Sequence, residues 1–324
     1  MLRKLIRKGA DLVDDLVASA SSAPPSAGSL TGVIFHAVND GSAGQANSPL
    51  APNLAVAVPV FRAFVEQMLE LGYTIVSPQQ IDAGLEPAGR YLAITFDDGY
   101  FNNALALEVL DEFRVPATFF VSSGHVLEGR AFWWDALSRE FSRSGGSGRA
   151  LRTETERLKG LSHGQAERLL CERFGASFLK PCSDLDRPFA PKELAQFAAS
   201  PWVHLGNHTR DHAILTNCTP EQRLEQMAAC QQALEDLTGK RPVAIAYPNG
   251  NSSPAVVASA LQAGLRVGFT VRQTRTPVPL SGDDQMAIGR FFFHGDKDVR
   301  RQCRMFGAPF VPSLAIRQLL QPAG

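Results

Sequence analysis

The stretch YLAITFDDG at residues 91–99 decides the fold, because an apolar run ends abruptly there in two carboxylates and a glycine. A short apolar run of this kind predicts a strand that is buried on both faces, as in a parallel sheet. A helical pattern over 100–113 and another strand pattern over 117–121 follow it. This alternation of strand and helix predicts parallel β-α-β units and therefore an α/β protein.

The same alternation extends over most of the chain. Strands are predicted at 32–36, 202–205, 243–246, 266–271 and 286–293, and helices at 60–71, 220–237 and 254–263. Between about 124 and 200 the pattern is instead helical and polar, with a Ser/Gly-rich stretch at 142–148. We interpret this segment as a helical insertion into one domain of residues 30–324, because the alternation resumes after it.

The composition limits the classes of partner. The 324 residues include 32 lysines and arginines and 32 aspartates and glutamates, so the formal net charge is zero. A balanced charge argues against a nucleic-acid partner, which needs a basic surface. No run of about 18 apolar residues occurs, so no transmembrane segment is predicted. The five cysteines are scattered without a C-x-x-C pair, which favours reduced thiols.

Residues 1–29 differ from the rest of the chain. Basic and acidic residues interrupt the apolar ones over 1–22, which is not the pattern of a secretory signal and favours a cytoplasmic location. We interpret 1–22 as an amphipathic helix and 21–28, rich in Ser, Ala and Pro, as a linker. The helix is expected to dock on its own domain or on a partner. The alternative is weak contact with a membrane surface through its basic residues.

Two short segments carry side chains suited to metal chemistry. Asp97 and Asp98 end a predicted parallel strand, where α/β barrels place their catalytic groups. His208 and His212, four residues apart in HTRDH, can converge on one ion from a helix or from a loop. One carboxylate and two imidazoles can hold a divalent cation with a position open for water, and the second carboxylate can take a proton from that water. The alternatives are a helix N-cap for the aspartates and a pair of surface histidines.

Together with the turn YPNG at 247–250, these segments resemble the polysaccharide deacetylases, carbohydrate esterase family 4, over roughly residues 30–295. TFDDG at 95–99 is similar to the first motif of that family and HTRDH at 208–212 to the second. The resemblance implies a distorted (β/α)7 barrel with its site at the carboxyl ends of the strands. It also implies that Asp97 is the catalytic base, that Asp98, His208 and His212 bind the metal, and that the backbone amide of Asn249 stabilises the oxyanion.

The chain departs from the family pattern at two points. Ala246 stands where many members carry an arginine that positions the base. Arg290 is a candidate to supply the guanidinium from a neighbouring strand, and an ordinary surface or ion-paired arginine is the alternative. The late histidine that acts as general acid in the family also has no clear counterpart. His36 and His294 are the candidates, and we favour His36 because it ends a strand that should open onto the same face of the barrel.

The resemblance implies hydrolysis of an N-acetyl, or O-acetyl, group on an amino sugar or polysaccharide. The expected cofactor is a divalent metal, with Zn²⁺ as the default for such ligands. The alternatives are a deformylase or other amide hydrolase acting on a nucleotide- or lipid-linked sugar, and a carbohydrate-binding barrel without activity. FWWD at 132–135 looks like a segment of some bacterial members. Its aromatic rings are expected to pack in a core, with stacking on a sugar ring as the alternative.

Overall fold

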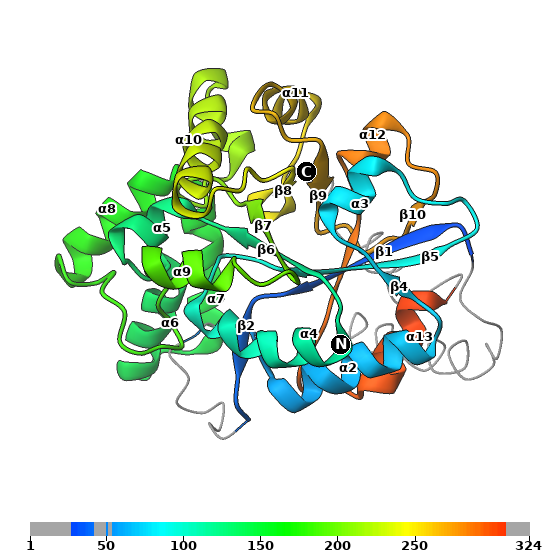
Figure 1. Cartoon of the computed structure of the whole chain (residues 1–324). Helices are drawn as coiled ribbons and strands as arrows, with labels where there is room; N and C mark the ends of the chain where they lie inside the picture. Colours follow the sequence, from blue (N-terminus) through cyan, green and yellow to red (C-terminus); the bar gives the residue numbers. More distant parts are fainter. Residues whose placement is uncertain (1–26, 42–49, 51–53, 309–324) are drawn as a thin grey trace, which may run out of the picture.

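The computed structural model describes residues 27–41, 50 and 54–308, and parallel strands form its centre (Figure 1). Each strand of the central series is parallel to the next, in the order β11 (Arg290–Phe292), β1 (Ser29–Phe35), β5 (Arg90–Phe96), β6 (Ala117–Val121), β7 (Val203–Asn207), β8 (Ala244–Ala246) and β9 (Val267–Phe269). A parallel bridge between Phe269 and Ile288 joins β9 to the segment just before β11, so the sheet nearly closes. The predicted distorted (β/α)7 barrel is confirmed.

Four short strands complete the described sheets. At the amino-terminal ends of the barrel strands, β4 (Thr74–Ile75) pairs in parallel with β5, and β10 (Thr276–Pro277) pairs antiparallel with β1. A separate two-stranded sheet of β2 (Ala37–Asn39) and β3 (Ala55–Ala57) follows β1. The carboxyl ends of the barrel strands are therefore left to the loops that carry the predicted site.

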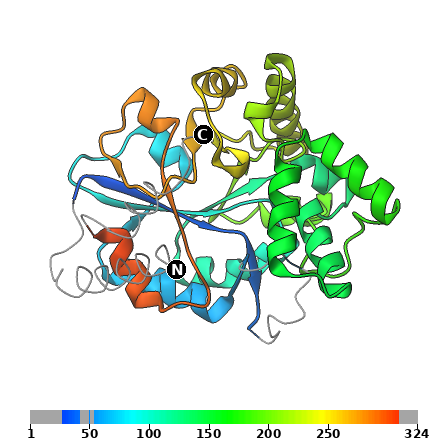
Figure 2. The same cartoon turned by 180° about the vertical axis from the view of Figure 1, so that it is seen from behind.

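Helices cover the outside of the barrel (Figures 1 and 2). Along one side, α2 (Val58–Glu70) packs between α4 (Leu107–Phe113) and α13 (Val299–Gly307). Along another side, α10 (Pro220–Thr238) packs between α9 (Pro191–Phe197) and α11 (Pro254–Gln262). The short α3 (Pro78–Ala83) lies against β9, and α12 (Gly282–Gln285) precedes β11. In this arrangement the helices bury the outward faces of the strands.

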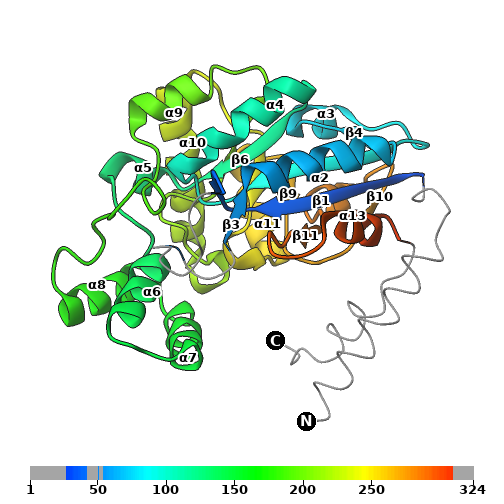
Figure 3. The same ribbon diagram turned by 90° about the horizontal axis from the view of Figure 1, so that it is seen from below.

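The segment between β6 and β7 is helical, as the sequence indicates. It consists of α5 (Ser123–Glu128), α6 (Trp133–Arg143), α7 (Gly148–Lys159), α8 (His163–Phe174) and α9. Figure 3 shows α6, α7 and α8 grouped beside the barrel. These three helices pack around an apolar cluster of their own that includes Trp133, Leu158 and Leu170.

Strand β5 is an apolar run that places a charged side chain at the open end of the barrel. Its outward side chains pack under the surrounding helices and are Leu92, Ile94 and Phe96. Tyr91 and Ala93 belong instead to the cluster inside the barrel. Because side chains alternate along a strand, Thr95 and then Asp97 continue the inward row toward the carboxyl end. A buried strand that ends in aspartate therefore places its carboxylate at the open end of the barrel.

The predicted single helix over 100–113 is wrong in its first half. The chain forms a 3₁₀ helix at Phe101–Ala106 (η2) before α4 begins. The side chains of Asn102 and Asn103 bond to distant backbone: Asn102 Oδ1 accepts from Val38 N at 2.8 Å, and Asn103 Nδ2 donates to His36 O at 2.5 Å. The tighter 3₁₀ winding occurs where these two bonds connect the segment to the residues that follow β1. The bond from Asn103 holds the backbone of His36.

The predicted helix over 1–22 and most of the linker at 21–28 lie outside the described residues. Both stay predictions, as do the membrane contact and the cytoplasmic location that were inferred from the same residues. Among the helices that the structure describes, none combines the length and the apolar character needed to span a bilayer.

Candidate active site

Asp97 and Asp98 are neighbours in sequence, yet both reach the same cavity at the barrel mouth. In an extended strand Asp98 would point the opposite way from Asp97. The backbone at Asp98 instead has a φ of 77°, in the left-handed region, and Gly99 follows with a φ of 88°. A Cβ on Gly99 would lie 3.0 Å from Cγ1 of Val121, so glycine suits both the conformation and the space. The turn, not the alternation of an extended strand, brings the two carboxylates together.

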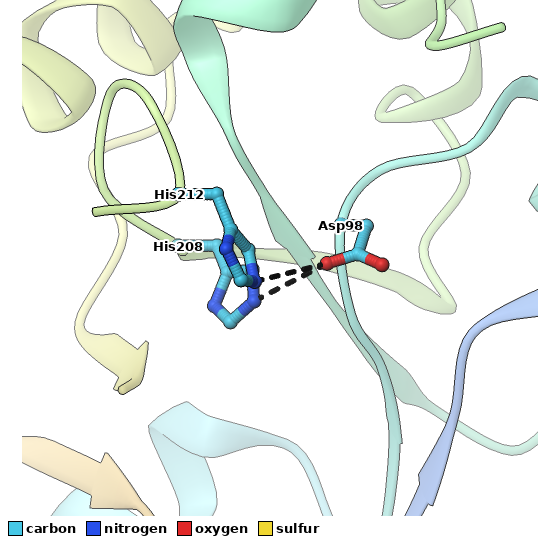
Figure 4. A group of neighbouring side chains, drawn as sticks. All are labelled: Asp98, His208 and His212. Atoms are coloured by element: carbon cyan, nitrogen blue, oxygen red, sulfur yellow. Dashed lines mark ion pairs between the residues drawn. The ribbon is translucent and has the colours of Figure 1, made fainter. Parts of the chain in front are cut away.

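Asp98, His208 and His212 form a compact group of potential ligands, with one ligand atom from each residue lying within 4.8 Å of the others. The Nε2 atoms of His208 and His212 both face Oδ1 of Asp98, at 3.5 and 3.4 Å (Figure 4). The imidazole rings lie 4.7 Å apart at 75° to each other, so they approach one point from different directions.

The histidines converge from a loop that follows β7, and not from one face of a helix. Thr209 and His212 both adopt left-handed backbone, with φ of 63° and 52°. Two local bonds hold these turns: Thr209 N donates to Asn207 Oδ1 at 2.8 Å, and Ala213 N donates to Thr209 Oγ1 at 2.9 Å. The loop alternative for this motif is therefore the correct one.

The donor set fits a small divalent cation. Ligands at about 2.0–2.1 Å from a tetrahedral ion lie about 3.3 Å from each other, close to the two distances between Asp98 and the histidines. His208 Nδ1 lies 2.8 Å from Ala246 O. Because a carbonyl oxygen can only accept, this bond fixes the proton on Nδ1 and leaves the Nε2 lone pair for a metal. One carboxylate and two neutral imidazoles suit Zn²⁺ and other first-row divalent ions.

Asp97 is not part of this triad but is held by Arg290. Arg290 is fully buried on β11, and its two terminal nitrogens donate to the two carboxylate oxygens of Asp97 at 2.6 and 2.9 Å. The guanidinium is itself anchored by Thr270 O at 3.0 Å and Thr95 Oγ1 at 3.0 Å. Such a bidentate pair fixes both the position and the orientation of a carboxylate. Arg290 is therefore paired with Asp97. The burial of Arg290 excludes the alternative that it is an ordinary surface residue.

The charges at the site determine the protonation of the two aspartates. Burial alone would raise the pKa of the Asp97 carboxyl, but the Arg290 guanidinium and His208 outweigh burial and hold that pKa below its ordinary value. Burial also opposes ionisation of Asp98, but the neighbouring imidazoles of His208, His212 and His36 lower its pKa to about 2. Both groups are therefore carboxylates at neutral pH, as a proton acceptor and a metal ligand must be.

A cavity of about 350 Å³ opens over these groups. It is lined by both aspartates and both histidines of the HTRDH motif. The other lining residues come from several parts of the chain and are Ile34, His36, Leu54, Trp133, Trp134, Thr155, Lys159, Asn249, Val271 and Phe292. The insertion thus supplies one wall of the cavity through α6 and α7. The sequence gives no signal for Thr155 and Lys159, because only the packing of α7 against the barrel brings them there.

The two candidate histidines for the general acid lie in different surroundings. His36, at the end of β1, lines the cavity together with Asp97, and its backbone oxygen is held by Asn103. His294 follows β11 and is absent from the described residues that line this cavity. Its backbone nitrogen and oxygen are both bonded at 2.9 Å to the side-chain amide of Gln302 on α13. The geometry therefore brings His36, and not His294, to the cavity.

Asn249 lies in the turn that follows β8. Its backbone is left-handed, with a φ of 58°, and the residue lines the cavity. Neighbouring Tyr247 is fully buried and donates its hydroxyl to Met286 O at 3.0 Å, which anchors the turn. A Cβ on Gly250 would lie 2.2 Å from Cγ2 of Val271, so the turn packs tightly against the segment after β9. A fixed turn of this kind can present a backbone N–H to a bound group.

The aromatic residues at 132–134 have both of the expected surroundings. Phe132 is fully buried, and Trp133 packs in the cluster of α6, α7 and α8 while also lining the cavity. The Trp134 ring lies 4.6 Å from the His212 ring, and Nε1 of Trp134 donates to the phenolic oxygen of Tyr100 at 3.2 Å. Trp133 and Trp134 therefore pack against the apolar cluster of the insertion and also line the cavity.

Comparison with known proteins gives consistent matches. The family described as "Polysaccharide deacetylase" matches the sequence over residues 85–268, more than half of the chain. The Bacillus subtilis (strain 168) protein YxkH, whose name assigns it to the polysaccharide deacetylases, is 22% identical over 243 residues. That match covers 74% of this chain and 63% of YxkH, so the chain spans less than two thirds of the length of this relative.

Solved structures share the fold. The crystal structure of BC0361, a polysaccharide deacetylase from Bacillus cereus, has a TM-score of 0.60 at 19% identity and covers 86% of this chain and 69% of its own. The Streptococcus pyogenes deacetylase PplD, solved in complex with acetate, has a TM-score of 0.60 at 16% identity and covers 87% and 99%. At these identities the likeness establishes the architecture of the chain.

Proposed function

The chain belongs to the polysaccharide deacetylase family, and on that premise we propose that it is a metal-dependent hydrolase that removes N-acetyl, or O-acetyl, groups from an amino sugar or polysaccharide. One observation carries the proposal. A carboxylate that is oriented by a buried arginine, and is not one of the clustered ligands, shares a cavity with three residues suited to bind one cation. This combination provides a proton acceptor beside a Lewis acid.

Asp98, His208 and His212 would hold a divalent cation, for which we propose Zn²⁺. When bound, such an ion polarises the acetyl carbonyl and lowers the pKa of a water molecule. Asp97 is placed to take a proton from the water molecule that attacks the carbonyl carbon. Arg290 keeps Asp97 ionised and aimed, since its two nitrogens occupy both carboxylate oxygens from one side. The family base and its arginine are thus supplied by different strands in this chain.

The remaining steps fall to groups on the cavity wall. The backbone N–H of Asn249 stabilises the negative charge that develops on the carbonyl oxygen. His36 gives a proton to the departing amine nitrogen, so that the sugar leaves as a neutral amine and acetate is released. Trp133 and Trp134 offer apolar surface to the sugar that carries the acetyl group, which is how aromatic side chains commonly line ligand sites.

The pairing of Arg290 with Asp97 also bears on the alternative of a barrel that binds sugar without activity. The support for that alternative was the alanine at position 246 in place of the family arginine. A buried guanidinium on Asp97 removes this support, because the same contact is made from β11. Ala246 retains a separate contact with the site, since its carbonyl oxygen accepts the Nδ1 proton of His208.

The proposal is tested by acetate release from acetylated amino sugars, from monosaccharide to polymer. The protein is first stripped with a chelator and then reloaded with one divalent ion at a time. Acetate should appear only after reloading, and the near-isosteric Asp97→Asn variant should release almost none. Formate is measured in parallel on formylated nucleotide- and lipid-linked sugars. Release of formate without acetate would favour the deformylase, and no release from any substrate by the reloaded protein would reject hydrolysis.

A further inference from the structure

Asp211 lies between His208 and His212, in the segment 208–212 that we call the metal loop, but its carboxylate takes no part in the cluster of ligands. Its two oxygens accept from two different elements: Oδ1 from Arg130 at 2.8 Å and Oδ2 from Gln226 Nε2 at 2.7 Å. Gln226, on α10, also holds the loop backbone. Its Oε1 accepts from Asp211 N at 2.9 Å, and its carbonyl oxygen accepts from Arg210 N at 2.9 Å. The residue next to His212 is thus fixed in both backbone and side chain.

Arg130 connects this loop to the helical insertion. It lies between α5 and α6, and its side chain is 14% exposed. Besides Asp211, the guanidinium contacts Glu167 of α8 and Glu128 of α5, the latter at 2.7 Å. Three carboxylates therefore share one arginine. The more exposed Arg210 also approaches two of them, Glu128 at 3.5 Å and Asp211 at 4.0 Å. Without the Arg130 guanidinium, the remaining repulsion among the carboxylates would weaken the contact between the elements.

A close backbone contact joins the same two regions. Gly124, at the start of α5, donates its N–H to Arg210 O at 2.7 Å. A Cβ on Gly124 would lie 2.7 Å from Asp211 Oδ1 and 2.8 Å from Arg210 O, so only glycine fits at this distance. The metal loop is therefore packed directly on the first helix of the insertion. The ion pair between Arg130 and Asp211 is a second contact between the same two regions.

We propose that Arg130 is a positioning residue of the metal centre. By holding Asp211, it fixes the loop that carries His208 and His212, and so it sets the affinity for the divalent cation. The proposal rests on the proposed function only in that the triad binds a metal. It assigns the insertion a role in metal binding beyond walling the cavity.

The size of the effect follows from the role of groups that orient metal ligands. Removal of such a group typically weakens metal binding by about 10- to 100-fold. Arg130 acts one residue away from His212, through Asp211, so about tenfold is expected for Arg130→Met. Arg130→Lys keeps the charge but lacks the planar fork that reaches three carboxylates, so its loss should be smaller.

The experiment measures Zn²⁺ affinity without substrate, by competition of the full chain with a chromophoric chelator. Arg139→Met is the matched control. Arg139 belongs to the same insertion and forms an ion pair of 2.7 Å with Asp186, which is fully buried, but in the described part of the chain the hydrogen bonds and ion pairs of these two residues do not involve the metal loop. Gln226→Met is the second variant, because it removes two bonds to Asp211 while retaining the size of the side chain.

We expect Arg130→Met to bind Zn²⁺ about tenfold more weakly, Arg130→Lys to recover part of the loss, Gln226→Met to lose several-fold, and Arg139→Met to stay within twofold. At saturating Zn²⁺, the kcat of Arg130→Met should return to near the wild-type value. Wild-type affinity in folded Arg130→Met, or in folded Gln226→Met should Arg130→Met not fold, would overturn the proposal. So would equal losses in Arg139→Met and Arg130→Met. The Zn²⁺ affinities are measured without acetate release, so an inactive protein that binds Zn²⁺ would reject the proposed function alone.

Discussion

Replacing Arg290 with glutamine removes the guanidinium from the Asp97 carboxylate. In the described part of the chain, both hydrogen bonds of that carboxylate come from Arg290. Asp97 and Arg290 are 5% and 0% exposed in their side chains, and two bonds of 2.6 and 2.9 Å join them. Breaking a buried ion pair by removing one partner costs about 3–5 kcal/mol of stability, because a charge is left buried and uncompensated. We therefore expect Arg290→Gln to unfold at lower denaturant, by an amount of that size at pH 7.

The same substitution changes the titration of Asp97. Because its pKa is lowered in the folded protein, the contribution of Asp97 to stability is fully present above the ordinary aspartate value of about 3.9 and is lost as pH falls through the folded-state pKa. The stability difference between wild type and Arg290→Gln should accordingly shrink as pH falls from the folded-state pKa of Asp97 in the variant to its lower folded-state pKa in the wild type. Without the guanidinium, burial dominates and raises the pKa of Asp97, so the acid limb of kcat/KM moves to higher pH.

The assay is the pH profile of acetate release for wild type, Arg290→Gln and Arg290→Lys, with unfolding curves on the same samples. Arg290→Gln should lose about 10²- to 10⁴-fold in kcat/KM, the range that a positioned general base contributes. Arg290→Lys should retain more, since a charge remains. Arg272→Gln is the control, because Arg272 is exposed on the neighbouring segment. An unchanged acid limb together with a loss below tenfold in Arg290→Gln would refute the assignment of Arg290.

Further outcomes are expected at other site residues and at His204 on β7. Asp97→Asn should keep bound metal and lose about 10²- to 10⁴-fold in turnover, whereas His208→Ala should lose both, as checked by metal analysis beside acetate release; Asp97→Asn with near-normal turnover would exclude it as the base. His36→Ala should slow acetate release far more than His294→Ala, and equal near-wild-type rates would eliminate both as the acid. Burial beside Lys240 lowers the pKa of His204 to about 4, so stability should fall as pH drops from about 6.5 to about 4. His204→Gln should flatten this fall in thermal unfolding, and an unaltered slope would contradict it.

The order of strands and helices could be predicted from the sequence because it depends on local patterns. The strand ending at Phe96 and the strand at 117–121 are predicted directly from apolar runs, and α10 is predicted from the helical pattern over 220–237. Closure of the barrel is different. It depends on one bridge between Phe269 and Ile288 and on the pairing of β11 with β1, which no local pattern specifies.

Site residues could be predicted where they lie close together in the sequence. They could not be predicted where only the packing of distant segments brings them together. The FDDG and HTRDH segments each carry their own ligands, so their residues could be named. The ion pair between Asp97 and Arg290 joins residues 193 positions apart, and only the structure decides between a pairing and a surface arginine. The left-handed backbone at Asp98 could not be predicted from the sequence pattern either, because a non-glycine residue rarely adopts this conformation without tertiary support.

The account depends most directly on one cation lying between Asp98, His208 and His212. Crystals grown with Zn²⁺ and measured at the zinc absorption edge test this without reference to substrate. We expect a single strong anomalous peak about 2.0–2.2 Å from a carboxylate oxygen of Asp98 and from the Nε2 atoms of both histidines, with Asp97 beside it and still paired with Arg290. Crystals with excess Zn²⁺ and no peak at this point would contradict the account.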